Sequence, residues 1–460
     1  MTLAPFTLGY AFRQGDVASD QTLVSDTARL QVVPKNRWPD GSLKFAVISG
    51  QANLLGNTPL TVILRSGTAS TVAALSLANL GASGAVATVD CGIYGSANWA
   101  GADWDSPFQA WISGPYMSSW VYRKPVGTDA HLVAWLEVRL YVGGAIEVLP
   151  WVENGFLRVA GPSSRATTFT VALGDSQRFS AAVDLPNHCR TPLVAGATLS
   201  HWLGEDPQVT IGHDTAYLQA SALVPAYRAM VPANASAIAS AVATYVPLQL
   251  GNHASAMGMA GYHGSVGLLP EWDVLYLTVP SQKTLASVIV NAYGAGRYGI
   301  HFRDETTQRP LRFSSYPNLV VGGGSGISSS GASSKSSYTP NATGTVPATW
   351  ASSHHPSLGF MAYLVTGRWY FMEEVQFVAT LNYLKNTDTS RLNAQGIFES
   401  SAGANTTRGA AWAIRAWTRS SNWLRDASYA RFSALPKASS SADPWLLNTS
   451  PRRPSRAAPL

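Results

Sequence analysis

Charged residues are scarce in this chain. Only 13% of its 460 residues are Asp, Glu, Lys or Arg, about half of the usual share. The 32 basic and 26 acidic residues give a net charge of +6, and half of that excess lies after Pro436. The remaining excess is too small and too scattered to indicate nucleic-acid binding. It suits an acidic polysaccharide as partner without requiring one.

Cysteine, long apolar runs and a secretion signal are also lacking. Cys91 and Cys189 allow one disulfide, which the sequence leaves open, but they exclude a disulfide framework or a cysteine-based metal site. No run of about 18 apolar residues occurs, so we expect no membrane span. The first residues lack the basic start and apolar segment of a signal peptide. We therefore expect a soluble protein, one that is virion-associated or released by lysis if it acts outside a cell.

Residues 1–200 predict a β domain. Trp-Pro-Asp-Gly-Ser at 38–42 separates two strand-like segments and has the residues of a tight turn. From Val133 to Leu140 polar and apolar residues alternate, and Gly143-Gly144 follows as a hairpin turn. Strands this short and frequent favour a sandwich or barrel. Residues 94–114 predict a loop, and residues 186–215 a connector between the two halves.

Residues 201–435 predict helices joined by long polar loops. Apolar spacing indicates helices at about 281–293, 356–365 and 368–385, and a further one within 407–432. Gly and Ser dominate residues 322–344, which predicts a flexible loop. Residues 436–460 are rich in Ser, Pro and Arg and predict a disordered basic tail. The fold class expected is thus multidomain β plus α.

The stretch from Asn252 to Asp273 carries the clearest functional signal. It combines histidines, a tyrosine and a tryptophan with glycines at every third position from 258 to 267. Such a polar, glycine-rich loop between apolar segments is a common place for binding or chemistry. The alternative is a surface loop whose histidines only make local hydrogen bonds.

Four segments resemble one family of carbohydrate enzymes. They are WPDGSLKFAVISG at 38–50, YVGGAIEVLPWVENG at 141–155, the segment from Ser352 to Leu384, and TRGAAWAIRAW at 407–417. Together they resemble the exo-acting rhamnogalacturonan lyases and their bacterial and phage-borne relatives, over residues 1 to about 430. The resemblance implies an N-terminal β barrel or sandwich followed by an α/α toroid. A full toroid of six helical hairpins needs roughly 300 residues, so we expect an incomplete, toroid-like helical domain here.

The resemblance implies a polysaccharide lyase that acts on a uronate-containing glycan by β-elimination. That chemistry needs a base, an acid and a group that stabilises the developing negative charge. Toroid lyases use Tyr or His as base and acid, and this chain has both types in its central stretch. We expect His263, Tyr262 and His253 to be catalytic, and the following residues to bind substrate: Asn252, His355, Arg408, Trp272, Arg297, His301 and Arg303.

Other chemistries are less well supported. His354-His355 and Glu373-Glu374 lack the spacing of metal ligands, so we expect neither a metal nor another cofactor. Gly294–Gly299 matches Gly-x-Gly-x-x-Gly but follows a helix, which excludes a dinucleotide site. A glycoside hydrolase needs paired carboxylates, and Glu271 with Asp273 is the close pair in the central stretch. A non-catalytic glycan-binding or structural component of a phage particle, including a homo-oligomer, remains the main alternative to a lyase.

Overall fold

The computed structural model describes most of the chain to residue 421. The described residues are 3–56, 58–127, 129–161, 163–228, 235–254, 257, 264–312, 315–316, 319–321, 337–340, 343–351, 354–384 and 407–421. Tyr262, His263, most of the Gly/Ser segment 322–344 and the basic tail lie outside them. Among the described residues, no helix has the length and apolar character needed to cross a membrane.

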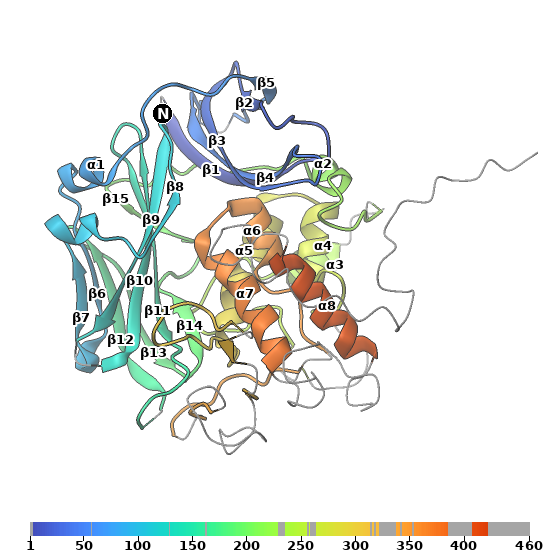
Figure 1. Ribbon diagram of the computed structural model, residues 1–460. Helices are drawn as coiled ribbons and strands as arrows, with labels where there is room; N and C mark the ends of the chain where they lie inside the picture. The colour runs from blue at the N-terminus through green and yellow to red at the C-terminus, as the bar shows by residue number, and fades with distance from the viewer. Residues whose placement is uncertain are drawn as a thin grey trace, which may run out of the picture.

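A six-stranded antiparallel sheet stands at the centre of the molecule (Figure 1). Its strands run in the order β14-β11-β10-β9-β8, and β15 also pairs with β11. They are β8 Gln109–Ile112, β9 Met117–Val126, β10 Asp129–Tyr141, β11 Ile146–Asn154, β14 Cys189–Pro192 and β15 His201–Leu203. The predicted hairpin joins β10 to β11, and Gly143 and Gly144 both have positive φ, 90° and 91°. A left-handed pair is the geometry that such a two-residue turn requires.

A four-stranded sheet covers one face of the central sheet, on the side away from the helices (Figure 1). Its order is β13-β12-β6-β7, with bounds Ser176–Leu185, Arg165–Leu173, Ala87–Asp90 and Ser96–Trp99. Leu136 and Val138 of β10 share one apolar core with Phe169 and Val171 of β12. The two sheets form a sandwich. None of the sheets closes on itself, so the barrel alternative is wrong.

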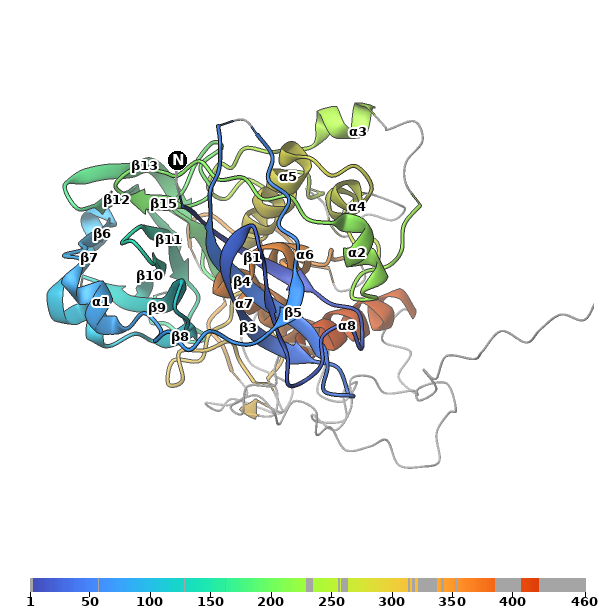
Figure 2. The same ribbon diagram turned by 90° about the horizontal axis from the view of Figure 1, so that it is seen from above.

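A third sheet lies over one end of the helices (Figure 2). It has the order β1-β4-β3, with bounds Ala4–Ala11, Leu43–Ala52 and Ala28–Arg37, and β2 Thr22–Val24 pairs with β5 Arg65–Gly67 nearby. The predicted turn at 38–42 links β3 to β4, where Trp38 N donates to Ser42 O at 2.8 Å. Phe45 of β4 packs against Tyr363, with ring centroids 5.0 Å apart.

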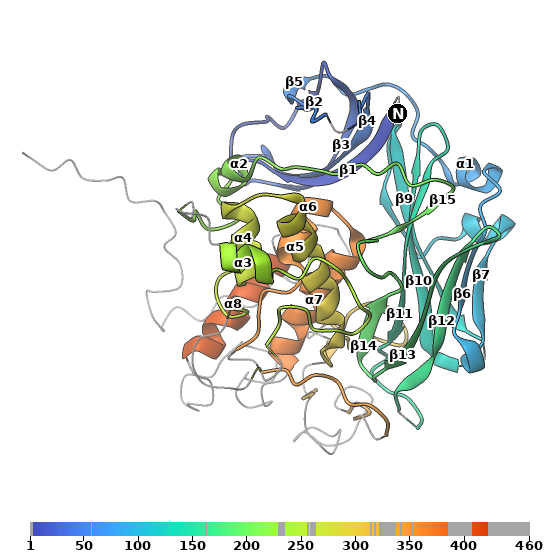
Figure 3. The same cartoon turned by 180° about the vertical axis from the view of Figure 1, so that it is seen from behind.

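The helices group on the other face of the central sheet, as the view from behind shows (Figure 3). They are α2 Thr215–Ala220, α3 Ala235–Ser240, α4 Glu271–Thr278, α5 Gln282–Gly294, α6 Phe360–Thr366, α7 Trp369–Leu384 and α8 Thr407–Ser421. The predicted break at 366–367 is confirmed, because Gly367 ends α6 in the left-handed region at φ +65°. The β-plus-α class is confirmed, and β15 extends the β domain slightly past residue 200.

Two predictions about segments without regular structure were wrong. Residues 94–114 contain β7 and β8, and residues 186–215 contain β14 and β15. All four strands have three or four residues, too few for an alternating pattern to show in the sequence. They form through pairing with long neighbours: β14 and β15 both add to β11. Edge strands of this kind depend on tertiary contacts more than on local propensity.

The alternation along β10 is confirmed, but its polar face does not meet solvent. Glu137 is 0% and Arg139 is 3% exposed. Arg139 donates to Thr366 O at 3.2 Å, at the end of α6. Arg368, at the start of α7, forms ion pairs with Glu137 and Glu147. Buried charges are tolerated when they are paired, so this face joins the sheet to the helical layer through ion pairs.

Candidate functional site

Three predicted site residues converge between α4 and α5. His253 packs edge-on against Trp272, with ring centroids 4.6 Å apart. Asn252 contacts the side chain of Asn291 on α5, whose Oδ1 accepts from the Asn252 backbone N–H at 2.7 Å. The predicted base and acid, His263 and Tyr262, fall outside the described residues. Arg408 lies in α8, but its side chain is also outside the described part.

His253 holds its ring in one orientation and one tautomer. Its Nε2 lies 2.7 Å from the backbone oxygen of Asn291. A carbonyl oxygen only accepts, so Nε2 carries the proton and Nδ1 carries the lone pair. Within the described part of the chain, Nδ1 is buried and has no hydrogen-bond partner. Burial lowers the pKa of His253 to about 4, although Asn291 O and Glu374 oppose this. The ring is therefore neutral near pH 7, with a proton-accepting nitrogen available.

Asp273 lines the same hollow as His253. The hollow is also lined by Trp272, Asn291, Ser357 and Gly359, and it has room for about one water molecule. Asp273 is 3% exposed. Burial raises its pKa well above the usual range, and the charge of Arg419 only partly opposes this. A neutral histidine with a lone pair, beside a carboxyl group whose pKa burial raises, is an arrangement suited to an acid–base pair.

A row of rings leads away from this hollow to His355. Tyr298 is 5.7 Å from His253 and 5.7 Å from Trp350, and Trp350 stacks on His355 at 4.8 Å. We call these rings, with Trp272, the aromatic row. His355 Nδ1 lies 2.9 Å from Pro356 O, and its Nε2 lies 2.9 Å from Asn382 Nδ2, which donates. Both nitrogens thus have internal partners, so His355 anchors the row.

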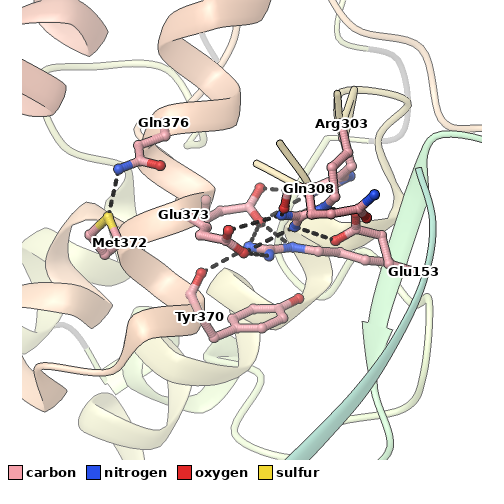
Figure 4. Close-up of polar contacts among 10 residues, drawn as sticks. Glu153, Arg303, Gln308, Tyr370, Met372, Glu373 and Gln376 are labelled. Carbon is pink, nitrogen blue, oxygen red and sulfur yellow. Dashed lines mark hydrogen bonds and ion pairs between the residues drawn. The ribbon is translucent and has the colours of Figure 1, made fainter. Parts of the chain in front are cut away.

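His301 and Arg303 belong to a different part of the molecule. With Arg190 they meet three carboxylates in a fully buried group that we call the ionic layer: Glu153 of β11, and Glu373 and Glu374 of α7. Figure 4 shows Arg303 between Glu153 and Glu373. Its Nη2 donates to Glu153 Oε2 at 2.8 Å and to Glu373 Oε2 at 3.0 Å.

Arg297, His301 and Arg303 were predicted to bind substrate, and the ionic layer gives two of them, His301 and Arg303, another role. His301 and Arg303 are at most 1% exposed, and their donors are taken by the chain's own acceptors. Arg297 donates to Val346 O at 2.7 Å. His301 and Arg303 thus join sheet to helix, whereas Arg297 contacts a loop, and the candidate site includes none of the three.

The carboxylate pair expected for a glycoside hydrolase is not formed. Glu271 and Asp273 lie in the first turn of α4, where residues two apart point in different directions. Glu271 is exposed, whereas Asp273 is buried. The predicted pairing assumed an extended segment, and the helix that starts at Glu271 places the two side chains in different directions.

Sequence reasoning missed Asn291, which both orients His253 and holds Asn252. A signal for it exists, because Asn291 is a polar residue within the apolar run Ser-Val-Ile-Val-Asn-Ala-Tyr of a predicted helix. It is 0% exposed. A buried amide in such a run needs partners, which here are Ser287 and Asn252.

Cys91 and Cys189 are buried free thiols. Within the described residues, no group of three or more His, Cys, Asp or Glu side chains could hold a metal ion. In comparisons with family models, curated proteins and solved structures, the chain matches none of them.

Proposed function

We propose that this chain is a carbohydrate-active protein, a polysaccharide lyase that cleaves a uronate-containing glycan by β-elimination. The observation that carries the proposal is the pairing of His253 and Asp273 around one hollow. His253 Nδ1 takes the proton from the carbon next to the sugar carboxyl group. The electrons left behind form the double bond and break the bond to the glycosidic oxygen, which Asp273 protonates.

The surroundings of the pair support this chemistry. The site is desolvated, which strengthens electrostatic interactions with a charge that develops in the reaction. Trp272 offers an aromatic face of the kind that packs against the C–H face of a pyranose. A sugar ring needs more space than the hollow has here, so binding requires the side chains that line it to move.

We also propose that the helical layer is a shortened α/α toroid. Consecutive helices pack in pairs, α4 with α5 and α6 with α7, and α5 also contacts α6. Helical hairpins that follow one another in this way are the repeating unit of a toroid. This proposal supports the lyase function through the family resemblance and is independent of the His253 geometry.

A non-catalytic glycan-binding or structural component of a phage particle is the second candidate. Two observations favour it: the hollow is small, and both ring nitrogens of His355 already have hydrogen-bond partners within the protein. In this case the aromatic row would stabilise the fold or bind a glycan without cleaving it.

The test is the ultraviolet absorbance of an unsaturated uronate product, measured with a panel of acidic polysaccharides. The panel includes rhamnogalacturonan and bacterial capsular polysaccharides. We expect a rise with the wild type and a loss of about 100-fold or more in His253→Gln and Asp273→Asn, the range for removing general acid–base catalysis. His263→Ala and Tyr262→Phe test the residues predicted from the sequence.

His201→Gln is the matched control. His201 is also buried, and its Nε2 also lies against a backbone oxygen, Leu193 O at 2.8 Å. It lies on β15, and this variant should retain the wild-type rate. Absence of a product on every polysaccharide, with retained glycan binding in affinity electrophoresis, would support the second candidate instead.

A further inference from the structure

Two arginines of α8 lie near the candidate site with only neutral partners. Arg415 is 8% exposed, and it donates to the backbone oxygens of Gly267 and of His355, the latter at 2.9 Å. Arg419, one turn later and partly buried, donates to Ser357 Oγ and to Leu268 O, the latter at 2.7 Å. Among the described residues neither guanidinium forms an ion pair, and Arg415 Nε has no hydrogen-bond partner.

Other buried arginines of this chain are built differently. Arg190 is held by Glu374, and Arg303 by Glu153 and Glu373. Arg368 is held by Glu147. A buried cation without an anion carries a desolvation penalty that hydrogen bonds to neutral groups only partly offset. Arg415 differs from these three arginines, because it is a buried cation whose counter-charge is missing within the described residues.

The two guanidinium groups also act on each other. Burial lowers the pKa of Arg415 well below its usual range, and the charge of Arg419 lowers it further. Burial lowers the pKa of Arg419 to about 10, while Asp273 opposes this. An anion placed beside both groups would remove this penalty, because it attracts each cation and offsets their mutual repulsion.

The position of the pair matches the candidate site. Arg415 and Arg419 line a small hollow with Ser357, Phe360 and Val375. Ser357 and Leu358 line this hollow and also the hollow of His253 and Asp273. An anion held by the arginines would thus occupy a space that shares two lining residues with the hollow of the acid–base pair.

We propose that Arg415 and Arg419 form the binding site for the carboxylate of the acidic sugar. This inference rests on the proposed function and adds the residues that recognise the substrate. A carboxylate matches a guanidinium fork and would satisfy the free Nε–H of Arg415. During β-elimination, negative charge grows on the carboxylate when the neighbouring proton leaves, and two adjacent cations stabilise it. The predicted Arg408 lies on the same helix, two turns before Arg415.

The test is isothermal titration of the full chain with sodium galacturonate, sodium glucuronate, galactose, sodium sulfate and sodium phosphate. We expect a uronate to bind and galactose not to bind. Arg415→Gln and Arg419→Gln should each weaken uronate binding by at least about tenfold, since a charge-assisted hydrogen bond contributes about 1.5–3 kcal/mol. Arg178→Gln is the control, because Arg178 also donates to a backbone oxygen, Gly204 O at 3.0 Å, but lies on β13.

Several results would overturn the inference. The wild type and both variants could bind uronate with equal affinity, or galactose could bind as tightly as galacturonate does. Sulfate or phosphate could bind while neither uronate binds, or no probe could bind at all. If Arg415→Gln does not fold, the uronate affinities of Arg419→Gln and Arg415→Lys test the carboxylate site instead. Arg415→Lys keeps the charge but loses the fork, and it should bind uronate more weakly than the wild type does.

The inference and the proposed function fail in different ways. Uronate binding that depends on the arginines, without any unsaturated product, would retain the carboxylate site and refute the lyase. Product formation that depends on His253 but is unchanged in both arginine variants would retain the lyase and refute the carboxylate site.

Discussion

Glu374 of the ionic layer gives the most quantitative prediction. The ordinary pKa of this carboxyl group is 4.5. Burial alone would raise it, but His301, Arg190 and the hydrogen bonds they donate outweigh burial and lower the pKa to about 2. Because the folded pKa lies below the unfolded one, the unfolded chain gains the proton first as the pH falls. The stabilisation from Glu374 is complete above about pH 4.5 and is lost as the pH falls towards 2.

The perturbation is Glu374→Gln. At pH 7 we expect it to lower the free energy of unfolding by about 3–5 kcal/mol, because Arg190 loses its main counter-charge in a site that is 0% exposed. Between pH 7 and pH 3 the Glu374 ionisation costs the wild type about 2 kcal/mol of stability. The variant lacks this ionisation, so its stability should fall by about 2 kcal/mol less over the same range.

The assay is urea unfolding followed by tryptophan fluorescence at pH 7 and pH 3. Glu205→Gln is the control, because Glu205 is exposed and its loss should leave the pH dependence unchanged. If the free energy of unfolding falls equally in Glu374→Gln and in the wild type between the two pH values, the neighbours of Glu374 do not lower its pKa. A loss below about 1 kcal/mol at pH 7, typical of an exposed pair, would refute the buried ion pair.

Three further predictions concern other parts of the chain. Gly367→Ala should lower the free energy of unfolding by about 3 kcal/mol, because φ is +65° and a Cβ would meet Val47 Cγ2 at 2.5 Å; Gly84→Ala, at φ +66° in open space, should cost only about 1 kcal/mol in the same urea unfolding assay. His253 should titrate with a midpoint of about 4 in a histidine NMR titration, because burial disfavours its charged form; a midpoint near the ordinary 6.5 would contradict the buried, neutral ring. Cys91 and Cys189 should not react with Ellman's reagent in the native protein and should both react in denaturant, because both are buried and burial raises the pKa of the Cys189 thiol to about 12.

Long, regular elements were predictable from the sequence because their patterns repeat. The alternation of β10, the hairpin at Gly143-Gly144, and the helices α5 and α7 appear within a few residues of their predicted bounds. Each of these segments has enough residues for one periodicity to dominate. The strands β14 and β15 could not be found, because they have only four and three residues.

The candidate site was predictable in part. Asn252, His253 and Trp272 fall within the single stretch from Asn252 to Asp273, and the ring of His253 packs against that of Trp272. Asp273 was considered only as the partner of Glu271 in a carboxylate pair, and in the helix these two side chains point in different directions. Arg415 was not among the predicted site residues, since the sequence does not show which charges lack a partner in the fold. His301 and Arg303 looked like ligand contacts, because their partners are far away in the sequence: Glu374 for His301, and Glu153 and Glu373 for Arg303.

Digestion of an acidic polysaccharide in ¹⁸O-labelled water, followed by mass spectrometry of the fragments, tests the central claim most directly. A lyase acting through His253 and Asp273 predicts an unsaturated uronate at the new end of the product, without ¹⁸O, and no such fragment from His253→Gln. Fragments with a saturated uronate at the new non-reducing end, and with more ¹⁸O at the reducing end than a product incubated without enzyme acquires by exchange, would show hydrolysis. An intact polymer with every member of the panel would show that the site does not cleave uronate glycans. Either result would contradict β-elimination.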